Sequence, residues 1–313
     1  MNCSLKCSRV GAPVAVAAAA LLASPAFGTL VIDNNFVNGN PLTGAGPLES
    51  AFYTTSSGSG LASDNGTPGV LDFASGSSGR AFHTLFAPQT LANAGDTLTV
   101  SYTFTTPATV GSNEDFRVGL FNTGGAPGFD TDISASSGTP NPILNNLPGF
   151  SGEFDINTDD ADLAIRTHDV NGSPTGRLLT TTGGFDFVSS GDNNGFDIDA
   201  NTQYTGTVVV VLDENGDLVI TQTLLGGTVD ETYTDTLPVA DIDGGDAGVN
   251  TLTFDFLGFS VTSGAFGSVN NAGEPDNGAD FNNISVSFEA VPEPGSLALL
   301  AAGVGLMAVR RRA

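Results

Sequence analysis

Glu153, Asp155 and Asn157 are the residues whose types and spacing could best support catalysis. They alternate with Phe154 and Ile156, which predicts a β-strand with the three polar side chains on one face. Two carboxylates on one face can act as nucleophile and proton donor in glycoside hydrolysis. An amide, however, cannot donate a proton to a leaving group, so Asn157 leaves the string without its general acid. We therefore expect an alternating strand with a polar outer face, and no enzyme.

The two histidines, His83 and His168, offer no second source of catalysis. Neither has a cysteine partner, a histidine at metal-ligand spacing or a Gly-x-Ser-x-Gly context nearby. Neither a zinc site nor a Ser-His-Asp triad is therefore indicated, and both histidines are expected to be ordinary strand residues. We assign no catalytic, cofactor-binding or metal-ligating residue from the sequence.

Four acidic loops place several oxygen ligands in one tight turn, as calcium requires. They are Asp159–Asp162, Asp192–Asp199, Asp213–Asp217 and Asp241–Asp246. None has the spacing of an EF-hand loop. Asp213–Asp217 is already explained as a hairpin turn, so Asp192–Asp199 is the preferred candidate. No cofactor is certain: calcium is left open, with solvated turns as the alternative.

Short apolar strands separated by Gly, Asn, Asp and Ser clusters fill the chain from residue 29 to 290. Thr97 to Phe104 alternates cleanly, which predicts one core face and one solvated face. Tyr204 to Leu212 is apolar on both faces, which predicts a strand buried on both sides, and Asn215-Gly216 predicts a hairpin to Leu218–Leu224. A phase slip in Leu252–Val261 predicts a bulge beside Gly258. The pattern favours a single all-β, antiparallel sandwich.

The N-terminal segment, residues 1–28, has the layout of a signal peptide. Lys6 and Arg9 form a positive region, Val14 to Leu22 an apolar region, and Ala26-Phe27-Gly28 a small-residue cleavage site, so we expect signal peptidase to cleave after Gly28. The alternative is a transmembrane helix, but the apolar run is short and ends in the cleavage pattern.

Charge and cysteine content limit how the segment 29–290 can be stabilised and which partners it can bind. Both cysteines precede it, so an exported chain must be stabilised by its core, by bound ions or by both. The segment has 33 acidic and four basic residues, a net charge of −29, which excludes nucleic acid as a partner. Divalent cations or a cationic partner are favoured. A solvated surface without a partner explains most of the charge equally well.

The C-terminal segment, residues 291–313, combines Pro292-Glu293-Pro294, an apolar run from Leu297 to Val309 and the basic cluster Arg310, Arg311 and Arg312. It resembles the sorting domain of PEP-CTERM proteins of Gram-negative bacteria, which exosortase processes. The 13 apolar residues would span about 20 Å as a helix, against a hydrocarbon core of about 30 Å. The arginines would keep the C-terminus cytoplasmic. The alternative is an unprocessed tail anchor.

This resemblance implies a route. The chain would cross the inner membrane, stay anchored by the transmembrane helix 297–309 until exosortase cleaves near Pro-Glu-Pro, and reach the cell surface or extracellular matrix. Signal peptidase and exosortase would be its processing partners.

A second resemblance concerns the fold. Leu91 to Asn122, which contains the string Phe116-Arg-Val-Gly-Leu-Phe-Asn122, is similar in layout to a concanavalin A-like, LamG-like jelly roll. The hairpin at 208–224 and the closing strand Phe281–Phe288 fit the same plan. The resemblance implies a structural or glycan-binding protein, with extracellular polysaccharide as a partner. Sugar-stacking aromatic residues are few, because the chain has no Trp and four Tyr. The alternative is a divergent polysaccharide-active enzyme of the jelly-roll glucanase type, which would use Glu153 and Asp155.

Overall fold

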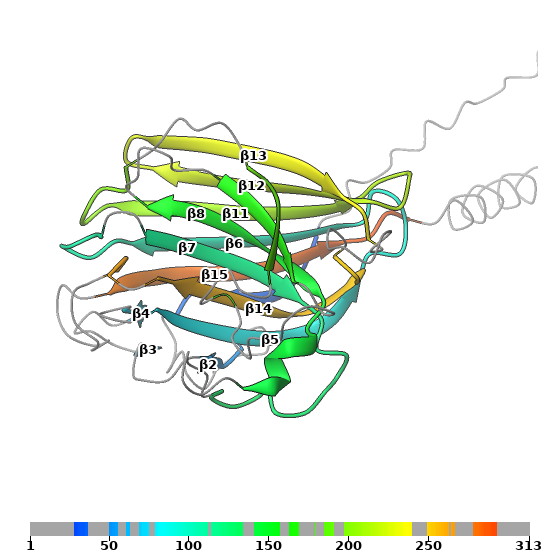
Figure 1. Cartoon of the computed structure of the whole chain (residues 1–313), viewed down its shortest axis with the longest axis horizontal. Coiled ribbons are helices and arrows are strands. Elements are labelled where there is room, and N and C mark those ends of the chain that lie inside the picture. The colour runs from blue at the N-terminus through cyan, green and yellow to red at the C-terminus, as the bar shows by residue number, and fades with distance from the viewer. Residues whose placement is uncertain are drawn as a thin grey trace, which may run out of the picture.

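The computed structural model describes residues 28–36, 50–55, 61–62, 69–74, 79–111, 114–133, 141–156, 163–168, 179, 185–190, 197–239, 249–262, 264–266 and 278–292. Residues 1–27 and 293–313, which carry most of both expected targeting segments, lie outside this part, as does Asn157. The described residues form a sandwich of two antiparallel sheets (Figure 1). The predicted all-β, antiparallel sandwich is confirmed.

The first sheet has eight strands in the order β13-β12-β11-β6-β15-β4-β3, with β1 beside β15. Their bounds are β1 Thr29–Asn34, β3 Leu61–Ala62, β4 Leu71–Phe73, β6 Thr97–Thr105, β11 Gln203–Leu212, β12 Leu218–Gly226, β13 Val229–Leu237 and β15 Ala279–Glu289.

The second sheet has seven strands in the order β10-β9-β8-β7-β14-β5-β2. Their bounds are β2 Phe52–Thr54, β5 Arg80–Thr90, β7 Glu114–Phe121, β8 Gly149–Ile156, β9 Leu163–His168, β10 Phe185–Ser190 and β14 Thr253–Val261. A short 3-10 helix, η1 (Pro142–Asn146), lies in the connection from β7 to β8.

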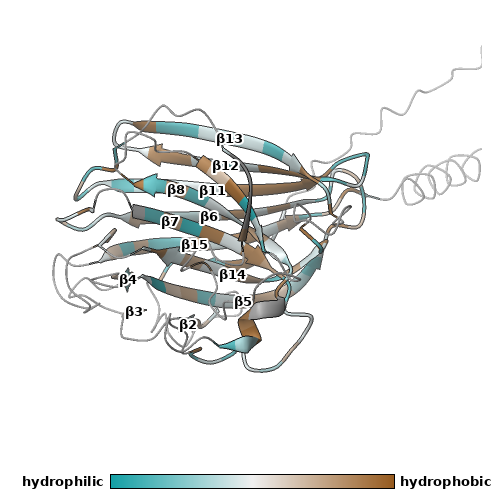
Figure 2. Cartoon of the chain, viewed as in Figure 1, coloured by the Kyte–Doolittle hydropathy of each residue, from teal (hydrophilic) through white to brown (hydrophobic). Residues whose placement is uncertain are grey.

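The main core fills the space between the sheets. Buried residues alternate with more exposed ones along β6, β11 and β12 of the first sheet. Figure 2 shows hydrophobic and hydrophilic segments along the strands of both sheets. The centre of the core is aromatic: the centroid of the Phe104 ring lies 5.4 Å from that of Phe116 and 5.5 Å from that of Phe281. Gly206 pairs with Tyr102 across β11 and β6, and a Cβ atom there would lie 2.0 Å from the tyrosine ring. Glycine at 206 thus lets the buried ring lie flat over the neighbouring strand.

A second, smaller apolar cluster covers the outer face of the seven-stranded sheet. Residues of the β7–β8 connection and Leu179 pack there on side chains of the sheet; the buried members are Phe121, Phe129, Ile133, Leu144, Leu147, Leu179, Phe185 and Phe256. Gly119 and Gly258, which pair across β7 and β14, leave a bare patch that the Leu179 side chain fills. Part of this sheet is therefore buried on both faces.

Two strand predictions need correction. Val209 and Val211 of β11 are half-exposed, so this strand is buried on one face only. Valine serves the outer face because β-branched side chains favour the extended backbone. The irregularity in β14 falls between Phe254 and Phe256 and not beside Gly258. The apolar phase slips beyond it because both faces of β14 are covered. The predicted β11–β12 hairpin is confirmed.

Candidate functional site

Glu153 of β8 lies at the centre of a buried ion cluster on the outer face of the seven-stranded sheet. Its Oε2 accepts hydrogen bonds from Arg117 Nε at 2.6 Å and Arg166 Nε at 2.8 Å, and its Oε1 accepts one from Arg166 Nη2 at 3.1 Å. Cross-strand pairing sets these contacts, because Arg117 of β7 pairs with Glu153 directly. Burial would raise the pKa of Glu153, but the two arginines outweigh it and lower that pKa.

The same cluster fixes the backbone at Leu179. Arg117 Nη1 and Ser260 Oγ both donate to the Leu179 carbonyl oxygen, each at 2.8 Å. Leu179 has φ of +62°, a left-handed conformation in which a non-glycine residue needs support. Arg117 therefore connects the carboxylates of the sheet to the segment that covers them.

Asp155 lies at the rim of this cluster, opposite Asp115 of β7. Burial raises the pKa of Asp155 to about 7, and hydrogen bonding and charge repulsion from Asp115 add to the shift. The Arg117 guanidinium pairs with Asp115, so its positive charge is shared between Asp115 and Glu153. With Asp155 protonated, two carboxylates face two guanidinium groups and the cluster is neutral.

Asp155→Asn is expected to flatten the pH dependence of stability. The unfolded carboxyl titrates near pH 4 and the folded one at about 7, so the native state binds the proton more tightly. The stabilisation is full below about pH 4 and is lost as the pH rises through 7. Discounted for partial exposure, the loss amounts to about 1–2 kcal/mol. Urea unfolding at pH 5 and pH 8 measures this loss of stability, and Asp230→Asn, at an exposed position of β13, is the control. An unchanged slope in Asp155→Asn contradicts the assignment.

Asp115, Glu153 and Asp155 each offer a carboxylate oxygen within 4.8 Å of the others. The donor set does not fit a divalent cation, because guanidinium groups already neutralise Asp115 and Glu153. A cation would have to displace buried charge-assisted hydrogen bonds. The cluster is an internal ion network that stabilises the fold.

The two histidines are strand residues, as predicted. His83 Nε2 lies 2.7 Å from the Phe129 carbonyl oxygen, and His168 Nδ1 lies 2.7 Å from that of Leu147. Burial lowers the pKa of His83 to about 4, so its ring is neutral and Nε2 donates to Phe129. His83 also stacks on Phe256 at 4.7 Å. It anchors the loop that leads to Asp130 and Asp132.

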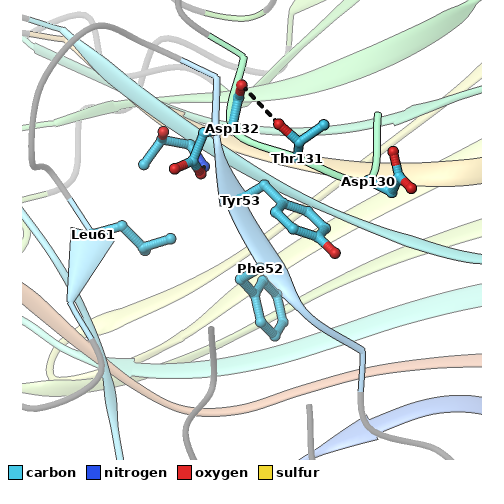
Figure 3. Close-up of a pocket in the computed structure, with 7 residues that line it drawn as sticks. Phe52, Tyr53, Leu61, Asp130, Thr131 and Asp132 are labelled. Atoms are coloured by element: carbon cyan, nitrogen blue, oxygen red, sulfur yellow. Dashed lines mark hydrogen bonds between the residues drawn. The ribbon is translucent and has the colours of Figure 1, made fainter. Parts of the chain in front are cut away.

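An open pocket of about 420 Å³ lies beside this anchored loop, at the edge of the seven-stranded sheet. Its lining residues come from β2, β3 and the β7–β8 connection: Phe52, Tyr53, Thr54, Leu61, Asp130, Thr131 and Asp132 (Figure 3). The Tyr53 ring packs against His83 with ring centroids 5.4 Å apart. Asp132 Oδ1 accepts the Thr54 N–H at 2.9 Å, and the Ile133 N–H donates to the Thr54 carbonyl at 2.7 Å. The loop is therefore fixed to the edge strand β2 by two hydrogen bonds at Thr54.

The acidic loops are described only in part. Asp213 Oδ1 accepts the N–H groups of Asn215 and Asp217, both at 2.8 Å, which confirms its predicted role in a hairpin turn. Of the preferred loop only residues 197–199 are described, where the Asp199 N–H donates to the Tyr204 hydroxyl. Asp159–Asp162, Asp192 and Asp241–Asp246 lie outside the described residues. The calcium prediction stays open.

Of the sorting residues, Pro292 is described and exposed, while Glu293, Pro294 and Arg310 to Arg312 lie outside the described part. Gly28 is described, beside β15. Among the described residues, no helix has the length and hydrophobicity of a membrane span.

Comparison with known proteins identifies the C-terminal segment. A protein family described as the PEP-CTERM protein-sorting motif matches residues 290–312. The chain therefore carries the sorting motif that its C-terminus resembles. No curated protein matches the sequence significantly.

The solved structures that match include a carbohydrate recognition domain, an exoplasmic/lumenal domain and a lectin. The Emp47p carbohydrate recognition domain is 14% identical, with 84% of this chain and 95% of that one covered and a TM-score of 0.42. The VIP36 exoplasmic/lumenal domain, bound to Ca2+ and Man3GlcNAc, is 11% identical, with 86% and 94% covered and a TM-score of 0.43. The Bauhinia forficata lectin in complex with GalNAc is 12% identical, with 84% and 100% covered and a TM-score of 0.42.

Proposed function

We propose that this chain is an exported protein of the cell surface or extracellular matrix, sorted by exosortase, whose sandwich binds glycans without hydrolysing them. The sorting motif at residues 290–312 supports the route. In this proposal residues 1–28 are the signal peptide, 29–290 the mature sandwich, and 291–313 the sorting signal. Signal peptidase and exosortase are the processing partners, and the protein is anchored in the inner membrane before release.

The pocket at Tyr53 carries the glycan-binding proposal. Its volume of about 420 Å³ lies within the range of about 300–1,000 Å³ typical of small-molecule sites. A tyrosine ring offers an apolar face and a hydroxyl group, and the carboxylates of Asp130 and Asp132 accept hydrogen bonds from sugar hydroxyls. Asp130, Thr131 and Asp132 are exposed, so their polar atoms are open to a ligand from solvent. The site needs no tryptophan.

The geometry at Glu153 supports a binding protein over an enzyme. A glycosidase nucleophile must reach the anomeric carbon, but Glu153 is only 4% exposed and both its oxygens accept from arginines. Asp155 could hold a proton at neutral pH, yet its neighbour Glu153 is turned into the ion cluster. The divergent glucanase is therefore the second candidate.

Binding and hydrolysis can be measured on the same samples. We expect the purified full-length protein, in detergent, to be retained by the extracellular polysaccharide of its source cells without release of reducing sugars. Asp130→Asn should weaken retention about tenfold, because a charge-assisted hydrogen bond contributes about 1.5–3 kcal/mol. Glu214→Gln, at the exposed tip of the β11–β12 hairpin, is the matched control. Asp132 is left unchanged because it also fixes the loop to β2.

Two outcomes decide between glycan binding at the pocket and hydrolysis, and a chelation experiment decides whether calcium takes part. Equal retention of Asp130→Asn and wild type rejects the pocket. Release of reducing sugars from the polysaccharide or from a β-glucan panel, lost in Glu153→Gln, supports the enzyme instead. Loss of retention on chelation would establish calcium as a cofactor and direct mutagenesis to Asp197 and Asp199; retention in chelator removes calcium from the proposal.

A further inference from the structure

The turn before β6, residues 92–96, binds the chain at Val291, where the sorting signal begins. The Val291 N–H donates to Asp96 Oδ1 at 2.8 Å, and we call this hydrogen bond the Asp96 latch. Asp96 Oδ2 accepts the N–H groups of Ala92 and Asn93, both at 2.8 Å, so the carboxylate is fixed by its own turn. The side chain is 1% exposed. Burial alone would raise the pKa of Asp96, but donation from Val291, Asn93 and Ala92 lowers it, so the acceptor is ionised.

The latch is also a close steric fit. Gly95 has φ of +91°, and a Cβ atom there would lie 2.8 Å from Val291 Cγ2. The Gly95 N–H donates to the Leu212 carbonyl oxygen at 2.7 Å, which ties the turn to the end of β11. Val291 therefore prolongs the contact between the end of β15 and the start of β6 beyond the Glu289–Thr97 pair.

The N-terminal and C-terminal ends of the described domain both lie near the turn before β6. Thr29 of β1 pairs with Phe288 of β15, and Gly28 lies beside Ser287. The expected signal-peptidase site therefore lies beside Ser287 and Phe288, only three to four residues before the start of the sorting signal at Val291. Both processing events would occur at the end of the sandwich that faces the membrane.

The latch restricts access to the sorting signal. Only five residues, 292–296, separate Val291 from the apolar run, and they span at most about 20 Å. A peptidase holds its substrate extended on both sides of the scissile bond. While Val291 is bound to Asp96, the residue before Pro292 is held against the turn before β6 and is not free to enter an active site. We propose that the Asp96 latch must open before exosortase cleaves, so that Asp96 is a positioning residue that slows sorting of the folded chain. This inference rests on the proposed sorting function.

Asp96→Asn in the full-length chain tests the latch. An asparagine cannot accept from both sides of the turn through two carboxylate oxygens, so the Val291 hydrogen bond is weakened. In a pulse-chase experiment in the source cells, we expect C-terminal processing at least about fivefold faster than in wild type, from the loss of one charge-assisted hydrogen bond. Signal-peptide cleavage, followed in the same lanes, should keep its rate.

Asp213→Asn is the matched control, because Asp213 caps the hairpin turn that follows Leu212 without contacting Val291. The melting temperatures of Asp96→Asn and Asp213→Asn show whether either variant has lost its fold. Val291→Pro removes the donor and also restricts the backbone at 290 and 291, and Val291→Ala, which keeps the N–H, controls for loss of the valine side chain. In Asp96→Asn, faster hydrogen exchange of the Val291 amide confirms that the latch is open. An open latch with unchanged or slower processing overturns the inference. Absence of any C-terminal processing in wild type, or unchanged processing when Pro292, Glu293 and Pro294 are alanine, rejects the sorting function instead.

Discussion

We expect a triple variant of the full-length chain to accumulate unprocessed in the inner membrane. In this variant Pro292, Glu293 and Pro294 are replaced by alanine. Proline breaks helical structure and restricts the residue before it, so the Pro-Glu-Pro string disfavours a helix next to the apolar run. Alanine has the highest helix propensity, so the triple variant favours a helix where the motif stood and should be a poorer peptidase substrate. Membrane fractionation with intact-mass measurement of the C-terminus reports the result, and we expect no processed product.

Glu289→Ala is the control for that experiment, since Glu289 is an exposed acid at the end of β15, outside the Pro-Glu-Pro string. It should be processed at the wild-type rate. Unchanged release of the triple variant contradicts sorting by this motif. If wild type itself remains unprocessed in the membrane, the segment is a simple tail anchor.

Arg117→Met is expected to lower the free energy of unfolding by about 3–5 kcal/mol, the usual effect of removing one partner from a buried ion pair. Arg117 is 3% exposed and donates to Glu153, to Asp115 and to the Leu179 carbonyl. Its loss leaves a buried carboxylate with less compensation and frees a left-handed residue from the face it covers. Denaturant unfolding measures the change.

Arg166→Met should cost less, because Arg166 is 17% exposed and its charge is more solvated. The double variant Arg117→Met/Glu153→Leu should recover part of the loss, since the buried Glu153 carboxylate is then removed with its partner, while Asp115, which also loses Arg117, is 25% exposed and better solvated. A loss below about 1 kcal/mol for Arg117→Met, or no recovery in the double variant, contradicts the account of a buried network.

Local pattern explains how much of the fold the sequence predicts. Alternation in Thr97–Phe104 and the Asn215-Gly216 turn need only neighbouring residues, and the structure confirms both. The error on Tyr204–Leu212 arose because a solvated strand face can carry valine when β-propensity favours it. The bulge in β14 was misplaced because a second apolar cluster covers that sheet, and burial on both faces removes the alternation that marks a register shift.

The candidate sites depend on contacts between distant segments. The missing general acid at Asn157 argued against catalysis, but nothing in the sequence places Arg117 and Arg166 on Glu153. Those contacts join residues 36 and 13 positions apart. The pocket joins β2 to a loop 78 positions away, through Thr54 and Asp132. Its one visible signal was Tyr53, one of four tyrosines in the chain. The sorting motif was predictable because it is contiguous.

Hydrogen exchange of the full-length protein, with and without the extracellular polysaccharide of its source cells, tests the glycan-binding claim most directly. Amide exchange follows local opening, so an occupied pocket should slow it in the segments that line the pocket. We predict added protection in residues 52–54 and 129–133, which in Asp130→Asn needs about tenfold more polysaccharide, with the hairpin at 213–217 unchanged. Protection confined to other parts of the sandwich, or none at saturating polysaccharide, would contradict the assignment of glycan binding to this pocket.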